Sequence, residues 1–92
     1  MRHHILVKWK KDIARPDHAV IDALFHQALA IPGVHSVSVH PNVIDRSNRY
    51  DLLILLCMDK EALPLYDACP MHHEWKDTYG PLIESKAIFD CE

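Results

Sequence analysis

The chain has 92 residues, and 49% of them are hydrophobic, which predicts one small folded domain over residues 1–92 and excludes a disordered polypeptide. The formal net charge is −3 and the ten basic residues are scattered along the sequence, so we expect no nucleic-acid partner. The longest apolar run, residues 52–58, is far too short to span a bilayer, so we expect no membrane partner.

The first predicted element is a strand over residues 3–10, where apolar and polar side chains alternate. A helix follows, with Pro16 expected at its first position and Asp17 at the positive end of its dipole. Apolar residues then recur at three- and four-residue intervals, until Pro32 and Gly33 end the helix. The apolar face of the strand carries His3, Ile5, Val7 and Trp9.

Two strands are predicted after this helix. Residues 34–39 alternate well enough for a strand that places His35, Val37 and Val39 on one side and Val34, Ser36 and Ser38 on the other. A polar, turn-rich segment leads to a third strand over residues 50–58, which is apolar on both faces. Such a strand needs cover on both sides. In so short a chain we expect a second copy to supply one of the covers.

The last part of the chain predicts a short helix capped by Asp59, a helical segment over residues 71–85 and a final strand over residues 86–91. Gly80 and Pro81 should kink or break the second of these. Ala87 and Phe89 share one face of the final strand. The order βαββαβ predicts an α+β, ferredoxin-like fold, in which both helices cover one face of a four-stranded antiparallel sheet. Its open face should meet a second sheet in a homodimer.

The segment from Tyr66 to Trp75 concentrates proton-transfer chemistry at a turn between two helices. Pro70 suits the first turn of a helix, and it pushes Cys69 before it toward an extended conformation. Tyr66 should therefore close one helix while His72 opens the next, and the bend can turn both side chains toward one point. We expect this pair to be the catalytic residues of any active site.

Motifs spread over nearly the whole chain resemble those of the stress-responsive A/B barrel (Dabb) family. Residues 66–72 look like its Tyr-x-x-His-Pro-x-His signature, with Cys69 in place of the first histidine. Weaker matches in the expected order are a basic-His-aliphatic strand at 2–10, an "IPGV" helix exit at 31–34, "YDL" at 50–52, an Ala-Leu-containing stretch at 58–63 and a closing strand at 88–90. This resemblance implies a dimeric α+β barrel.

The family that the chain resembles includes heat-stable plant proteins of structural character and a plant polyketide cyclase. In that cyclase the signature tyrosine and last histidine act together, and a histidine of the first strand lies near the pocket. The resemblance therefore implies that Tyr66 and His72 are catalytic and that His3 lies beside the ligand. The replacement at Cys69 affects any role that depends on an imidazole there.

Two functions from different classes follow from these residues. As a general base and a phenol donor, His72 and Tyr66 suit a cofactor-free cyclase or isomerase that enolises a small organic molecule. Alternatively, His72 orders the helix start and Tyr66 covers the core, in a non-catalytic stress-associated dimer. A third class, a monooxygenase-like dimeric barrel, shares the architecture without a distinguishing residue here. Whether the protein is an enzyme stays open.

Other candidate residues complete this interpretation. Trp9, Cys69 and Trp75 are expected with His3 around the ligand. The eight histidines and three cysteines show no HxxxH or CxxC spacing, so we expect neither a metal site nor a cofactor. The N-terminal segment lacks the features of a signal peptide, so we expect reduced cysteines and a cytoplasmic protein.

Overall fold

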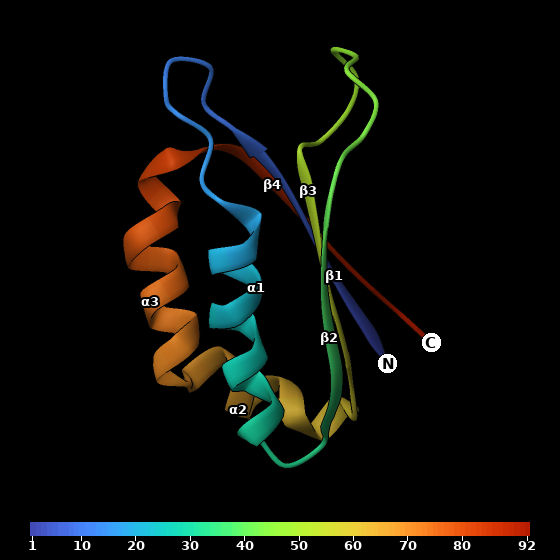
Figure 1. Cartoon of the computed structure of the whole chain (residues 1–92). Coiled ribbons are helices and arrows are strands. Elements are labelled where there is room, and N and C mark those ends of the chain that lie inside the picture. The colour runs from blue at the N-terminus through green and yellow to red at the C-terminus, as the bar shows by residue number, and fades with distance from the viewer.

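The computed structural model describes residues 1–92, and it has a four-stranded antiparallel sheet with its helices on one face (Figure 1). The strands lie in the order β2-β3-β1-β4. Their bounds are Arg2–Trp9 for β1, Val34–Pro41 for β2, Leu52–Met58 for β3 and Ile83–Cys91 for β4. The helices are α1 (His18–His26), α2 (Leu63–Ala68) and α3 (Pro70–Tyr79). The expected ferredoxin-like α+β fold is confirmed.

The core lies between the helices and one face of the sheet. Alternate residues of β1 and β3 point into it, and Val7, Ile54 and Leu56 are fully buried. From the helix layer, Phe25 and Trp75 meet them, with ring centroids 5.0 Å apart. As the alternation in the sequence predicts, the buried face of β1 carries His3, Ile5, Val7 and Trp9. No helix of the protein combines the length and apolar character needed to cross a membrane.

Strand β2 differs from its expected pattern because it contains a bulge. Val34 pairs with Met58 and Ser36 with Cys57, so His35 is an extra residue between two consecutive pairs. Strict alternation is lost there, and Val34 and Val37 both face the core. The prediction that these two valines lie on opposite sides was therefore wrong.

Element boundaries also differ from prediction where prolines stand near a helix start. Helix α1 begins at His18 rather than at Pro16, because Asp17 is its N-cap and accepts a hydrogen bond from the Ala19 amide at 2.9 Å. Asp59 precedes a 3₁₀ turn without capping it through its side chain. Instead, its carboxylate accepts a hydrogen bond from His35 Nε2 at 2.9 Å.

The helical segment that was expected over residues 71–85 is shorter than predicted. It ends at Tyr79 and is followed by a 3₁₀ turn over Gly80–Leu82, so the break expected at Gly80 and Pro81 is confirmed. The chain then enters β4 at Ile83, which pairs with Trp9, and not at residue 86. Strand β3 begins at Leu52, so Tyr50 belongs to the preceding loop. Both strands begin at a residue that pairs with β1, since Leu52 pairs with Val7 and Ile83 pairs with Trp9.

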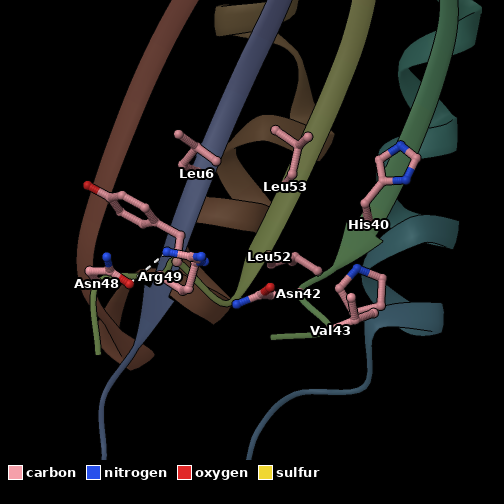
Figure 2. A pocket seen from close by; sticks show the side chains of 10 residues that line it. Leu6, His40, Asn42, Val43, Asn48, Arg49, Leu52 and Leu53 are labelled. Atoms are coloured by element: carbon pink, nitrogen blue, oxygen red, sulfur yellow. Dashed lines mark hydrogen bonds between the residues drawn. The ribbon is translucent and has the colours of Figure 1, made fainter. Parts of the chain in front are cut away.

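The second face of the sheet carries no helix (Figure 1). Phe89 and Ala87 pair with His4 and Leu6 and thus share this face, as predicted from their spacing, and Phe89 is 63% exposed. Figure 2 shows Leu6, Leu53 and His40 on the neighbouring strands β1, β3 and β2. They line a hollow of about 420 Å³ together with Val43 and Tyr50 of the 42–51 loop. This open face is the apolar surface that the sequence predicted.

Candidate functional site

A cavity of about 260 Å³ lies between the sheet and the α2–α3 pair. Strands β1 and β4 form one wall, and the two helices form the other. Half of its lining residues are hydrophobic, so it offers apolar contacts beside polar groups at defined positions. The lining residues are His3, Ile5, Leu63, Tyr66, Asp67, His72, Trp75, Lys86, Ile88 and Asp90.

The bend at Cys69 brings two lining residues together. Cys69 is extended, with φ −73° and ψ 153°, and Pro70 starts α3 directly after it. Tyr66 therefore lies in the last turn of α2 and His72 in the first turn of α3. Their rings lie with centroids 4.8 Å apart at an interplanar angle of 55°. The local sequence thus places a phenol beside an imidazole.

The Tyr66 hydroxyl is buried and has no hydrogen-bond partner in the protein. The whole residue is only 1% exposed. Burial, followed by the nearby Cys69 and Asp67, raises the pKa of the phenol well above its usual 10.0. At neutral pH the group is therefore a neutral O–H donor. Neither the backbone nor another side chain accepts that proton.

The environment of His72 keeps its imidazole neutral. Its Nδ1–H donates to the carbonyl oxygen of Asp67 at 2.9 Å, because a carbonyl can only accept. In the neutral ring, Nε2 then carries the free lone pair. Burial lowers the pKa of His72 from 6.5, while the bond to Asp67 opposes that change. His72 is thus arranged as a base.

His3 completes the polar end of the cavity from β1. It is 6% exposed, and its Nδ1 lies 2.5 Å from Oδ1 of Asp90 on β4. Its ring meets Tyr66 edge-on, with centroids 5.5 Å apart and an interplanar angle of 64°. The carboxylate fixes the orientation of the His3 ring, and that ring restrains the phenol.

The six residues that the sequence nominated do not all reach this cavity. Tyr66, His72, His3 and Trp75 line it together. Trp9 lies outside the lining and packs on Trp75, with centroids 6.4 Å apart. Half-buried Cys69 lines a separate groove with Ile31, Pro32 and Met71.

Sequence reasoning missed Asp90 and Lys86, which belong to the same wall. Asp90 pairs with His3 and Lys86 with Val7 in the antiparallel register of β1 and β4, so both point to the helix side. The two-residue period of the last strand places Lys86 and Asp90 on one face. Only the register between β1 and β4 shows that this face is turned toward the helices. Asp67 contributes through its backbone carbonyl, for which side-chain patterns give no signal.

The histidines and cysteines do not gather into a metal-ligand set. No group of three or more His, Cys, Asp or Glu side chains lies close enough to hold a metal ion. Three of the histidines pair singly with carboxylates instead: His3 with Asp90, His26 with Asp22 and His35 with Asp59.

The family described as Stress responsive A/B Barrel Domain matches residues 1–92. No curated protein matches the sequence. Among solved structures, a Dabb family protein with a ferredoxin-like fold from Mesorhizobium loti has a TM-score of 0.70 at 20% identity, with 99% of this chain and 93% of that chain covered.

Two further solved structures show the range of proteins with this fold. A dimeric ferredoxin-like protein of unknown function from Thermobifida fusca has a TM-score of 0.76 at 16% identity, covering 96% of this chain and 85% of that one. A hydroxynitrile lyase from Passiflora edulis has a TM-score of 0.71 at 15% identity, covering 96% of this chain and 87% of that one.

Proposed function

This chain belongs to the stress-responsive A/B barrel family, and we propose that it binds and enolises a small carbonyl compound in the cavity beside Tyr66 and His72. We also propose that it works as a homodimeric barrel. The reaction is a cyclisation or an isomerisation, both of which need proton transfer at carbon and stabilisation of an oxyanion.

The observation that carries the proposal is the unpartnered hydroxyl of Tyr66. A buried hydroxyl without a partner costs about 1–3 kcal/mol of stability. A phenylalanine would fill the same space without that cost, so packing alone does not explain a tyrosine here. A ligand oxygen that accepts the proton does explain it. The neighbouring imidazole, 4.8 Å away from ring to ring, supplies the complementary base.

Each group has one task in the proposed step. His72 Nε2 takes a proton from the carbon next to the carbonyl, and that C–H electron pair moves to form the enolate. The Tyr66 O–H donates a hydrogen bond to the oxygen that gains negative charge. The α-carbon of the enolate then attacks a second carbonyl carbon and leaves an alkoxide, or the enolate takes up a proton at another of its carbons. The proton held by His72 returns to the product, so the histidine ends neutral.

The cavity volume limits the ligand. Pockets for drug-sized ligands span about 300–1,000 Å³, and this one measures about 260 Å³. The ligand should therefore be smaller than a typical drug. Trp75 and Ile5 offer apolar contacts to its body, while the polar groups hold its carbonyl end. The hydroxynitrile lyase of similar fold supports the idea that this architecture can hold an active site.

The open face of the sheet supports the proposed homodimer. Leu6, Leu53 and the 63% exposed Phe89 place apolar surface on it, and the Thermobifida fusca protein of similar fold is described as dimeric. The measurement is the solution mass. We expect a dimer for the native chain and a monomer for Phe89→Lys, because a buried unpaired charge is costly. A native chain that is monomeric at micromolar concentration would contradict this.

The enzymatic proposal is tested by screening small aromatic and polyketide-like carbonyl compounds for turnover. His72→Ala should lose at least about a hundredfold in kcat, the usual contribution of a general base. His73→Ala is the matched control, since His73 is the next residue and is exposed, and its turnover should stay unchanged. Equal turnover of both variants would exclude His72 as the base. Ligand binding that His72→Ala leaves intact, with no turnover in the native protein, would favour the non-catalytic alternative.

A further inference from the structure

A second hollow of about 470 Å³ lies at the end of the sheet where β1 ends and β3 begins. The loop over residues 10–17 borders one side and the loop over residues 42–51 borders the other, and Figure 1 shows both loops at that end. We call this space the loop-end hollow. It is separate from the Tyr66–His72 cavity, with which it shares no lining residue.

The loop-end hollow collects positive charge in a protein that is negative overall. Three carboxylates, Asp45, Asp51 and Glu84, are the opposing charges in its lining. With six cations, the lining has a formal surplus of three positive charges, while the whole chain carries −3. Two loops thus gather charges that are far apart in sequence, which raises the local concentration of anions. The cations are Lys8, Lys10, Lys11, Arg15, Arg46 and Arg49.

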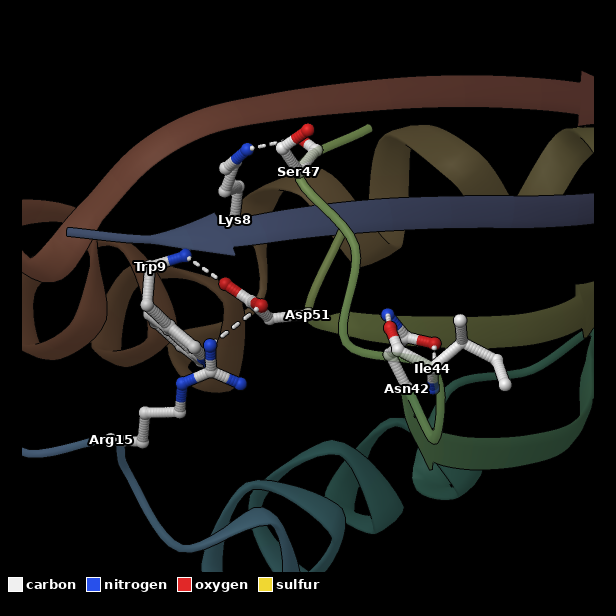
Figure 3. Close-up of polar contacts among 7 residues, drawn as sticks. All are labelled: Lys8, Trp9, Arg15, Asn42, Ile44, Ser47 and Asp51. Atoms are coloured by element: carbon white, nitrogen blue, oxygen red, sulfur yellow. Dashed lines mark hydrogen bonds and ion pairs between the residues drawn. The ribbon is translucent and has the colours of Figure 1, made fainter. Parts of the chain in front are cut away.

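Hydrogen bonds connect the two loops and fix this arrangement, as Figure 3 shows. The carboxylate of Asp51 accepts from the Trp9 amide at 2.8 Å and from Arg15 Nη2 at 3.0 Å. Lys8 Nζ donates to the Ser47 carbonyl at 3.1 Å. All three contacts join the end of β1 or the loop after it to the 42–51 loop. The hollow therefore has fixed walls, and Asp51 is already neutralised by Arg15.

Five cations of the lining have no acidic partner. None of the ion pairs of the protein contains Lys8, Lys10, Lys11, Arg46 or Arg49, and the side chain of Arg49 donates only to the Asn48 side chain, at 2.7 Å. Like charges that line one hollow repel one another. An anion bound among them would reduce that repulsion.

We propose that the loop-end hollow binds a small molecule through a phosphate or diphosphate group. A phosphate monoester carries about 1.5–2 negative charges at pH 7. One or two phosphate groups therefore match a surplus of three charges better than a single carboxylate does. Arg46 and Arg49 bring planar guanidinium groups that bind phosphate oxygens in pairs, and Lys10 and Lys11 add point charges.

The test uses the full chain and inorganic pyrophosphate as the probe, followed by ¹H–¹⁵N NMR. Amides of residues 10–15 and 45–51 should shift together in a saturable way. The Arg46→Gln/Arg49→Gln variant should weaken pyrophosphate binding by about tenfold or more. The matched control is Lys60→Gln/Lys76→Gln, which removes the same charge outside the hollow and should bind as the native chain does. Equal weakening in both variants, or no saturable shift in the native chain, would overturn the proposal.

A second arm identifies the source of the phosphate. Phosphatidylcholine vesicles with and without phosphatidic acid are floated with the protein. Saturable pyrophosphate binding without flotation supports a free phosphate compound. Pyrophosphate binding together with flotation only on phosphatidic acid, lost in Arg46→Gln/Arg49→Gln, supports a lipid headgroup. Flotation without pyrophosphate binding would overturn the proposal, since it would show a diffuse surface charge and no built site.

Discussion

The Tyr66–His72 cavity and the loop-end hollow use opposite physical means. The first depends on two neutral groups, Tyr66, which is 1% exposed, and the half-buried His72, whose pKa burial lowers. The second depends on exposed side chains such as Lys10, Lys11 and Arg46 that stay charged in water. Packing and single atoms should therefore control the cavity. The charges and the guanidinium groups of the lining should control the hollow, and because these side chains are exposed, substituting them should change stability little.

The largest effect is expected where the cavity meets the core. Trp75 is 2% exposed. The centroid of its ring lies 5.0 Å from that of Phe25 and 5.1 Å from that of Tyr79. Trp75→Ala leaves an unfilled space and should reduce the free energy of unfolding by about 3–5 kcal/mol in urea denaturation. The control is Lys76→Ala at the exposed neighbouring residue, which should change the free energy of unfolding by less than about 0.5 kcal/mol. Similar losses in both would mean that Trp75 is not a packing residue.

A smaller effect, of opposite sign, is expected at the hydroxyl. Tyr66→Phe removes a buried O–H that has no partner, so the free energy of unfolding should rise by about 1 kcal/mol. Any carbonyl ligand should bind less tightly at the same time. Tyr79→Phe is the control, because Tyr79 is only half-buried and its hydroxyl is not buried without a partner. If Tyr66→Phe is less stable than the native chain, the hydroxyl has a partner within the protein and the case for a ligand oxygen is lost.

The smallest effect concerns the charge state of His72. Its pKa in the folded protein lies below 6.5, the ordinary value that applies to the unfolded chain. As the pH falls through 6.5, the unfolded chain binds a proton that folded His72 does not, so this residue lowers stability under acidic conditions and has no effect above that range. NMR titration of the His72 ring should give a midpoint below 6.5. In His72→Gln, stability should decline less between about pH 7.5 and about pH 5. A midpoint above the ordinary value would contradict the buried environment.

The sequence predicts the fold well because local patterns determine most of it. The alternation in β1 and β3 identified the buried face, and Pro70 identified the junction that brings Tyr66 and His72 together within seven residues of chain. The bulge at His35 was missed, because the pairing with β3 decides it and not the alternation of β2 itself.

The wider surroundings of the candidate site could not be predicted in the same way. Asp90 reaches His3 only through the β1–β4 register, and Arg46 and Lys11 line one hollow only through the path of two loops. Both arrangements join distant parts of the chain, for which a one-dimensional pattern holds no distance information. Basic residues that look scattered in the sequence are therefore gathered in space.

The contact between His3 and Asp90 joins residues that are 87 positions apart. On a ribosome, the first of them emerges long before the second, while Tyr66 and His72 emerge almost together. A nascent chain can thus form the helical junction early, but the carboxylate that orients His3 arrives only when β4 pairs with β1. The cavity is consequently completed only after β4 has been synthesised and paired, and a chain translated only through α3 should hold the phenol and the base without an oriented His3.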